Sequence, residues 1–224
     1  MKNLFFLLLH VCLFSIVITG CETSEVNSPV ETPDTSILEM VSIDTDGNVE
    51  NHVIDQSEVN KFRRINTTRS RGATKVRGHM DWFPNDSENT WKKSINATGT
   101  ATEGRGQIEI KSNFWGDVHS SVLCVFADGG EAVVAMYIEN AKEVLHPVYE
   151  EGRIVYFKLA DNGEGNNDPA DQHYNTVRYY TQKFDTREEA EVFFEEEAAT
   201  CEFMFYNRSF GTASDIREGN FQVM

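Results

Sequence analysis

Side chains that could bind a metal ion are most concentrated between residues 161 and 171. This segment follows an apolar run and is rich in oxygen-bearing side chains: Asp161, Asn162, Glu164, Asn166, Asn167, Asp168 and Asp171. Calcium binds about six to eight oxygen atoms, and Gly163 and Gly165 would let the backbone fold around an ion. The candidate carboxylate ligands for calcium are Asp161, Glu164, Asp168 and Asp171. The alternative interpretation is a solvated acidic loop whose side chains cap its own turns, and we expect no other cofactor.

Two pairs of residues could support metal binding or acid–base chemistry on a strand. His79 and Asp81 are separated by one residue, as are Asp117 and His119, so each pair would share one face of its strand. The sequence has no H-x-x-x-H or H-E-x-x-H spacing, which excludes a helical zinc pair. Strands with polar residues on a solvated surface explain both pairs more simply.

Motifs of nucleophilic catalysis are absent from the sequence. There is no G-x-S-x-G elbow, and Ser120, next to His119, would point to the opposite face of its strand. Aromatic side chains could instead line a sugar-binding face: Trp82, Phe83, Trp91, Phe114, Trp115, Tyr179 and Tyr180. We prefer to place them in the core, because burial of their large apolar rings stabilises a fold.

The N-terminus has the pattern of an export signal. Lys2 is followed by an almost wholly apolar run over residues 4–18, which is too short for a comfortable membrane-spanning helix. Residues 18–21 (Ile-Thr-Gly-Cys) then resemble the lipobox of bacterial lipoproteins. This resemblance implies that residues 1–20 are removed and that Cys21 carries lipid, which would anchor the protein in the cell envelope, at the outer membrane or cell surface. The alternative is an ordinary secretory signal followed by an unrelated cysteine.

Cysteine usage agrees with an exported protein. Cys12 lies within the signal and Cys21 at the expected lipidation site, which leaves Cys124 and Cys201 in the mature domain. An even pair in an oxidising compartment predicts one disulfide, here between two apolar strands. A catalytic cysteine is the alternative, although apolar surroundings raise the pKa of a thiol and reduce its reactivity.

The chain is strongly acidic, with 36 Asp and Glu against 20 Lys and Arg and a formal net charge of -16. Such a surface repels nucleic-acid phosphates and disfavours flat adsorption on anionic lipid. It favours solubility and makes cation binding physically easy. The expected partners are therefore a membrane through the N-terminal lipid and a glycan or another envelope protein, but no nucleic acid.

The first part of the mature chain, residues 21–74, is predicted to be a tether or linker. Residues 22–36 are rich in Thr, Ser, Glu and Pro and almost lack large apolar residues. Two apolar runs flank Asp44–Asn48 and predict a small hairpin over residues 37–55. A calcium loop is disfavoured there, because its glycine comes too early for an EF-hand. Residues 56–74 predict a short helix or a second linker.

Residues 75–224 have the pattern of an all-β domain. About nine short strands are predicted, some with period-two alternation and some continuously apolar, at 75–82, 91–97, 107–111, 118–127, 131–138, 153–159, 176–184, 201–206 and 219–224. Strands of this length, separated by Gly-containing turns, predict an antiparallel β-sandwich or open barrel. Residues 186–199 break the pattern, because Thr186 and Glu189 form a capping box before a run of strong helix formers. They predict one peripheral acidic helix.

Three segments of this domain are distinctive together. They are the V-H-x-x-V-x-C strand at 118–124, the D-N-G-E-G turn at 161–165 and the closing G-N-F-Q-V strand at 219–223. With them the domain, roughly residues 75–224, resembles a β-domain of secreted and anchored bacterial proteins, some of them labelled choice-of-anchor proteins. The resemblance implies an all-β secreted module without an assigned activity. The chain departs from that pattern at residues 78–82 and in its acidic helix.

These observations favour a non-enzymatic, lipid-anchored β-sandwich that acts as a binding or structural module on the cell envelope. The alternative is an envelope hydrolase acting on carbohydrate, with a site assembled from loops. A pocket in which His79, His119 and carboxylates converge would favour the hydrolase, whereas a shallow aromatic pocket would favour a glycan-binding module. The sequence does not predict the oligomeric state.

Overall fold

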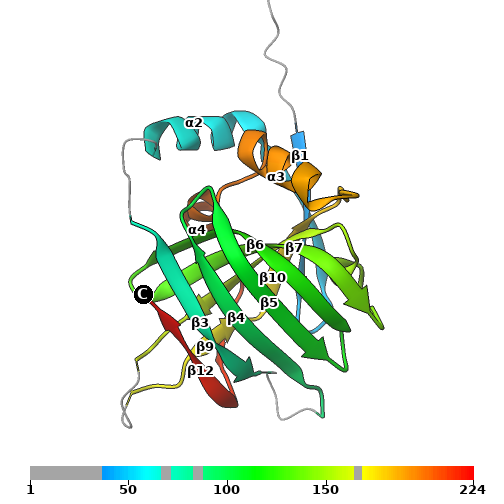
Figure 1. Cartoon of the computed structure of the whole chain (residues 1–224), viewed down its shortest axis with the longest axis vertical. Coiled ribbons are helices and arrows are strands. Elements are labelled where there is room, and N and C mark those ends of the chain that lie inside the picture. Colours follow the sequence, from blue (N-terminus) through cyan, green and yellow to red (C-terminus); the bar gives the residue numbers. More distant parts are fainter. Residues whose placement is uncertain (1–36, 67–71, 83–87, 164–167) are drawn as a thin grey trace, which may run out of the picture. The chain divides into compact units, whose positions relative to one another are not determined.

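The computed structural model describes residues 37–66, 72–82, 88–163 and 168–224. Within these ranges the chain forms one antiparallel sheet of 12 strands with three α-helices (Figure 1). The strands are β1 (Ile37–Asp44), β2 (Val49–Asp55), β3 (Thr74–Asp81), β4 (Trp91–Gly99), β5 (Gly104–Ser112), β6 (Asp117–Asp128), β7 (Glu131–Lys142), β8 (Ile154–Ala160), β9 (Gln172–Tyr174), β10 (Thr176–Tyr180), β11 (Ala213–Asp215) and β12 (Glu218–Val223). The helices are α2 (Gln56–Asn66), α3 (Arg187–Glu196) and α4 (Cys201–Asn207), with a short 3-10 helix, η1, at Pro147–Tyr149.

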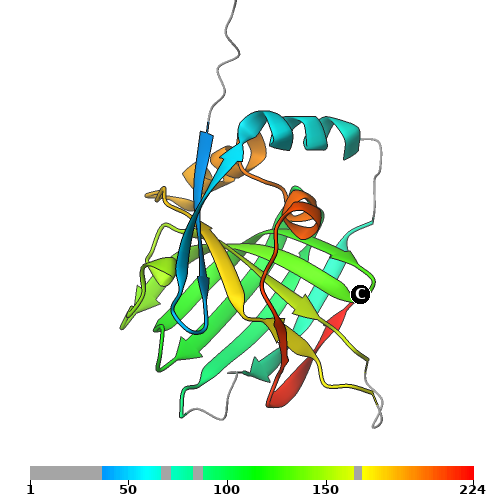
Figure 2. The same cartoon turned by 180° about the vertical axis from the view of Figure 1, so that it is seen from behind.

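The sheet curls around one of its faces. Its strand order is β12-β3-β4-β5-β6-β7-β8-β10-β1-β2, and β9 pairs with both β8 and β11. Three strands separate β4 from β8, yet the Lys93 Nζ of β4 lies 3.5 Å from the ring centroid of Phe157 on β8. The two strands therefore face each other across an enclosed interior, and Figure 2 shows this curvature from behind. The predicted antiparallel sandwich or open barrel is confirmed as a single curled sheet that does not close on itself.

Gly106 permits a close approach between strands β4 and β5. Gly106 on β5 has a φ of +123°, a backbone conformation that side-chain-bearing residues rarely adopt. A Cβ atom at this position would lie 1.9 Å from the carbonyl oxygen of Asn96 on the neighbouring strand. Only a residue without a side chain fits there, so the close approach of β4 and β5 at this point depends on this glycine.

Apolar side chains pack on both faces of the sheet. The enclosed face carries one core, which includes Trp82, Trp91 and Trp115. The opposite face of β6, β7 and β8 carries a second core together with α3 and α4. A strand buried on both faces needs apolar residues at successive positions, which explains the continuous apolar runs of these three strands. Strands β4 and β5 alternate strictly between buried and less buried residues, because only one of their faces is covered.

Helix α3 forms where the capping signature predicts it. The Thr186 Oγ1 accepts a hydrogen bond of 3.2 Å from the backbone N–H of Glu189. At the other end of the helix, the Arg63 guanidinium of α2 donates to the carbonyl oxygens of Phe194 and Ala198. A cation at the negative end of the helix dipole is favourable. Arg63 therefore links α2 to the C-terminal end of α3.

A disulfide joins Cys124 of β6 to Cys201 of α4, with the two Cα atoms 5.9 Å apart. The predicted pairing is confirmed, but the prediction of a strand at 201–206 is wrong. This segment is helix α4, which begins where the Thr200 hydroxyl accepts a hydrogen bond from the Phe203 N–H. A short apolar run fits a buried helix as well as a strand, so periodicity alone could not separate them.

The predicted hairpin at residues 37–55 is present as β1 and β2. It is part of the sheet rather than of a tether, because β1 pairs with β10 along residues 40–44. Met40 and Ile43 are buried in the two cores on opposite faces. Asp44 closes the turn by accepting hydrogen bonds from two backbone N–H groups, as expected for a turn. Strands β9 and β11 were not predicted, since three residues are too few to show a period.

Candidate binding face

The outer surface of β3, β4 and β5 is not packed against a helix. In the described part of the chain, α3 and α4 pack on β6 and β7, and α2 packs beside β2. The outward side chains of the three strands, which we call the β3–β5 face, are Lys75, Arg77, His79, Asp81, Lys92, Ser94, Asn96, Thr98, Arg105, Gln107, Glu109 and Lys111. All are polar or charged, so the face can recognise a ligand only by charge and hydrogen bonding.

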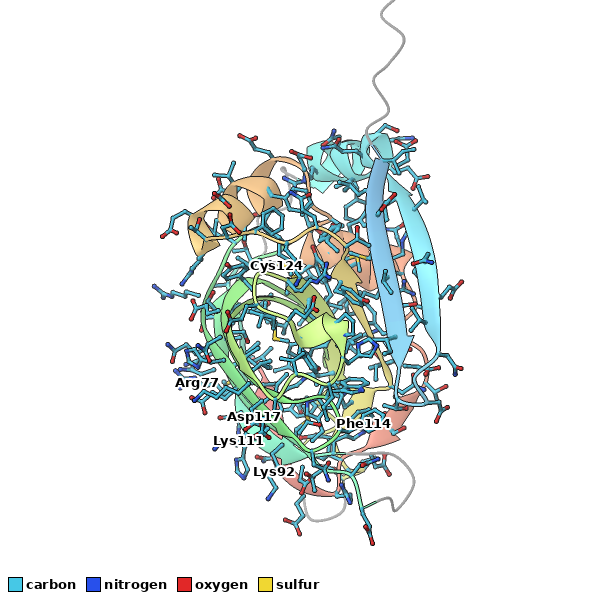
Figure 3. The ribbon with its side chains drawn as sticks, turned by 90° about the vertical axis from the view of Figure 1, so that its right-hand side faces the viewer. Arg77, Lys92, Lys111, Phe114, Asp117 and Cys124 are labelled. Atoms are coloured by element: carbon cyan, nitrogen blue, oxygen red, sulfur yellow. A yellow bond between two sulfur atoms is a disulfide. The ribbon has the colours of Figure 1, made fainter. Side chains whose placement is uncertain are left out.

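The β3–β5 face is positively charged in a protein that is otherwise acidic. It carries five Lys and Arg side chains but only two carboxylates, whereas the whole chain has a formal charge of -16. None of these five cations has a side-chain hydrogen bond or ion pair with another described residue. Figure 3 shows three of them, Arg77, Lys92 and Lys111, along the outer side of the curved sheet. Several cations elsewhere are paired, such as Lys183 with Glu150 and Arg187 with Glu191.

Strand register places two lysines directly side by side. Lys92 on β4 is the register partner of Lys111 on β5. Like charges directly opposite each other destabilise a sheet. On its other side Lys92 faces Asp81, but that carboxylate lies 3.5 Å from the guanidinium of Arg217. The two lysines are thus adjacent at this end of the face, and the Asp81 carboxylate beside Lys92 also interacts with Arg217.

A groove of about 380 Å³ lies at the same end of the face. Strands β3, β4, β5 and β12 contribute its charged lining: His79, Asp81, Lys92, Glu109, Lys111 and Glu218. The lining contains no aromatic side chain from the described residues other than the imidazole of His79. A ligand in this groove would meet hydrogen-bond donors and both signs of charge, not a wide stacking surface.

The two histidine–aspartate pairs lie on the outside of the sheet and do not converge. His79 lines the groove, whereas His119 lies one strand beyond it, between the carboxylates of Glu109 at 3.7 Å and Glu139 at 3.6 Å. Asp117 accepts a hydrogen bond from the backbone N–H of Ser112. His79 makes no contact with a described carboxylate that would orient it as a general base, so these residues form a polar surface.

The tryptophans are buried, as the preferred interpretation predicts. Trp82, Trp91 and Trp115 are at most 2% exposed. The ring centroids of Trp91 lie 5.0 Å from Trp82 and 4.9 Å from Trp115. They fill the enclosed interior and offer no outward sugar-binding surface. Tyr179 and Tyr180 are also buried, and Phe83 lies outside the described residues.

A buried Lys–His pair sits among these aromatic rings. The Lys93 Nζ lies 2.9 Å from the His173 Nε2, and both side chains are fully enclosed. The His173 Nδ1 lies 2.6 Å from the carbonyl oxygen of Tyr174, so Nδ1 carries the proton and Nε2 accepts from the lysine. Burial lowers the pKa of Lys93, and burial together with Lys93 lowers the pKa of His173. Neutral forms of both groups are therefore favoured.

Sequence patterning held one clue to this pair. Lys93 occupies the inward position between Trp91 and Ile95, where the alternation of β4 calls for an apolar residue. A lysine at such a position signals a buried amine that needs a partner. Its partner His173 lies on β9, a strand too short to be predicted.

The loop that begins at residue 161 holds the free edge of the sheet. The Asp171 Oδ2 accepts from the N–H of Phe221 and the Asp161 Oδ2 from that of Val223, both at 2.8 Å. The other oxygens of the two carboxylates accept from the loop's own N–H groups, at Asn162 and Gly163. Strand β12 thus has β3 on one side and two carboxylates in place of a strand on the other.

Calcium binding by this loop stays a prediction. Asp161 and Asp171 already accept hydrogen bonds from the backbone of β12, and Glu164 lies outside the described residues. Asp168 lies so close to Gly163 that a Cβ atom on this glycine would be 2.7 Å from the Asp168 Oδ2. Across the described ranges, no group of three or more His, Cys, Asp and Glu side chains is arranged to hold a metal ion.

Cys21 and the signal segment of residues 1–20 also lie outside the described residues. Among the helices that the structure does describe, none is long and apolar enough to cross a membrane. Lipidation of Cys21 therefore stays a prediction from the sequence.

The chain matches no protein-family model, no curated protein and no solved structure. The similarity to secreted β-domains that its strand and turn motifs imply stays a prediction. The chemistry of the β3–β5 face has to be argued from its own residues.

Proposed function

We propose that this protein is a lipid-anchored binding module of the cell envelope, and that its ligand contacts the β3–β5 face. The observation that carries the proposal is a polar surface with five cations that have no partner among the described residues, in a chain of net charge -16. Like charges placed side by side, as at Lys92 and Lys111, cost stability. A ligand that supplies the missing negative charge offsets that cost.

Binding fits this face better than hydrolysis does. Its groove contains His79 together with carboxylates, but no described carboxylate contacts the imidazole to orient it. General acid–base catalysis needs a positioned proton donor or acceptor within hydrogen-bond reach of its partners. We therefore place the role of this face in recognition, and keep a carbohydrate-directed hydrolase as the alternative.

Membrane anchoring is tested by removing the thiol that would carry lipid. In Cys21→Ser the signal can no longer be processed through lipid attachment, because a hydroxyl does not replace the thiolate in alkylation. We expect the wild-type protein in the membrane fraction with acyl mass on its N-terminal residue, and the variant without that mass. Equal masses and equal membrane retention of the two proteins would contradict the anchor.

The binding face is tested by photocrosslinking in intact cells. A benzophenone amino acid replaces Ser94 at the exposed centre of the face, and in a control it replaces Val192, which is 55% exposed on α3. We expect a ligand adduct from position 94 and none from position 192. Adducts of the same kind from both positions, or from neither, would remove the basis for the proposed face.

A further inference from the structure

We propose that the ligand of the β3–β5 face is an acidic polysaccharide, bound in extended form through its anionic groups. This inference rests on the proposed function, because it names the ligand class of the same face. Its evidence is the distribution of the five cations and of the hydrogen-bonding side chains between them.

Four of the five cations lie at the two ends of the face, and Arg77 lies opposite Asn96 near its middle. Lys92 and Lys111 are register partners at one end, and Lys75 and Arg105 both lie opposite Thr98 toward the other end. Lys92 and Thr98 are six residues apart on β4, which is roughly 20 Å along an extended strand. One small anion cannot contact both ends. An extended polymer with anionic groups at intervals can reach the two sites together, which raises its affinity through effective concentration.

The middle of the face suits a hydroxyl-rich chain. Ser94, Asn96 and Gln107 point outward between the charged ends. Asn96 and Gln107 are register partners, so their amides form a pair of donors and acceptors on adjacent strands. Such side chains hydrogen-bond to sugar hydroxyls. Because the face has no Phe, Tyr or Trp side chain, its selectivity would come from charge and hydrogen bonds rather than from ring stacking.

Charge on the rest of the molecule argues against the other large anions. The face is a local exception in a chain of net charge -16. A nucleic acid or an anionic membrane has dense negative charge over a wide area, which the acidic surroundings would repel. A polysaccharide that carries one anionic group per sugar or fewer is narrow enough to lie on the face alone.

A matched pair of polymers isolates the role of charge. The probes are polygalacturonate and its methyl ester, which share one backbone and differ only in free carboxylates. The full mature chain is tested with both by biolayer interferometry, at low and at physiological salt. We expect binding to polygalacturonate that weakens as salt rises, and no binding to the ester.

Charge reversal locates the binding. Lys92→Glu/Lys111→Glu changes two residues of the face, and Lys61→Glu/Lys142→Glu makes the same change in charge at two exposed lysines away from the face. We expect the face variant to weaken polygalacturonate binding at least about tenfold, and the control variant by less than about twofold. Circular dichroism and melting of each variant show whether its fold is intact.

Several outcomes would overturn the ligand class. Equal binding of the ester and the acid would show that the protein does not recognise charge. Equal losses of polygalacturonate binding in the two variants would show that the polymer does not bind at the β3–β5 face. Binding to phosphatidylglycerol vesicles but not to polygalacturonate, lost in the face variant, would replace the polysaccharide by a membrane and leave the binding face in place. By contrast, failure of the position-94 crosslink would overturn the face itself.

Discussion

At the scale of single residues, Lys93 and His173 bring two titratable groups into the enclosed core. Each is the hydrogen-bond partner of the other, and rings of Trp82, Trp91 and Phe157 surround them. Apolar groups of similar size would fill this space with less desolvation cost. The pair therefore contributes to specific packing of the interior, not to a gain in stability, and it explains why a lysine breaks the apolar pattern of β4.

Substitutions of the buried pair should be strongly non-additive. His173→Phe alone leaves the buried Lys93 amine without its acceptor, so we expect the free energy of unfolding to fall by about 1–3 kcal/mol. Lys93→Met/His173→Phe removes both polar groups, and we expect its stability to match or exceed that of the wild type. Urea unfolding at pH 8 measures both. A double variant as unstable as the single one would contradict this account.

The same pair predicts a pH dependence. The pKa of His173 is lowered from its ordinary value of 6.5, so below that pH the unfolded chain binds a proton that the folded chain does not. The unfolding free energy should therefore fall as pH drops through 6.5. In the double variant the fall should be smaller, although His52 and His146 also have lowered pKa values and keep part of it. Identical slopes for the two proteins would show that folding does not lower the pKa of His173.

At the scale of elements, the two edge strands of the sheet differ in how their free backbone groups are covered. Strand β2 ends the sheet with exposed Val49 and Val53, on an edge that no described strand pairs with. Strand β12 ends it with N–H groups that donate to carboxylates of the residue 161–171 loop. A sheet edge that is covered in this way cannot pair with another chain. Asp161 and Asp171 of that loop thus cover the β12 edge of the sheet.

Removal of one of these carboxylates should loosen the edge. In Asp171→Ala the N–H groups of Phe221 and Asn162 lose their acceptors, and we expect a loss of about 2–4 kcal/mol of stability. Asp171→Asn keeps one acceptor oxygen, so its stability should lie between that of the wild type and that of Asp171→Ala. Thermal unfolding measures the series, and hydrogen exchange at Phe221 reports the edge directly. A wild-type midpoint for Asp171→Ala would show that the hydrogen bonds contribute little.

Calcium is tested in the same melting experiment, with EGTA and then with millimolar calcium. If the loop binds calcium, the midpoint rises by mass action, with a gain in stability of about 2.7 kcal/mol at a hundredfold excess over Kd, and Asp168→Asn reduces the rise. An unchanged midpoint contradicts the calcium prediction. It leaves the carboxylates with their role at the sheet edge.

Local sequence patterns were sufficient to predict most of the helices and strands. They were insufficient where tertiary contacts determine the conformation. Alternation identified β4 and β5, and the capping box located α3. The conformation of residues 201–206 depends on a cap at Thr200 and on packing against β6, neither of which shows in a period. Similarly, the candidate face depends on strand register, since His79, Lys92 and Lys111 become neighbours only when three hairpin strands align. Their proximity and their lack of partners among the described residues could not be read from the sequence.

At the scale of the whole described domain, charge and packing divide the sheet into two regions. Strands β6, β7 and β8 lie between two apolar cores, and α3 and α4 cover their outer side. Strands β3, β4 and β5 carry one core and leave their other face to solvent. Strands β6, β7 and β8 are held in place by burial on both faces. They can therefore keep β3, β4 and β5 rigid while the exposed face of those strands binds a ligand.

The disulfide should determine how firmly the helical layer is held to the sheet. Cys124 and Cys201 are both buried, and their bond closes a loop across 77 positions of sequence. In the chain-entropy model, opening a loop of that length costs about 4 kcal/mol of stability. We expect Cys124→Ala/Cys201→Ala to lose that much stability in urea unfolding, with hydrogen exchange rising first in α4, because α4 then has no covalent link to β6. The wild type in dithiothreitol should approach the variant, whereas the variant itself should not respond to the reductant. A variant with wild-type stability and unchanged exchange in α4 would show that packing alone holds the two layers together.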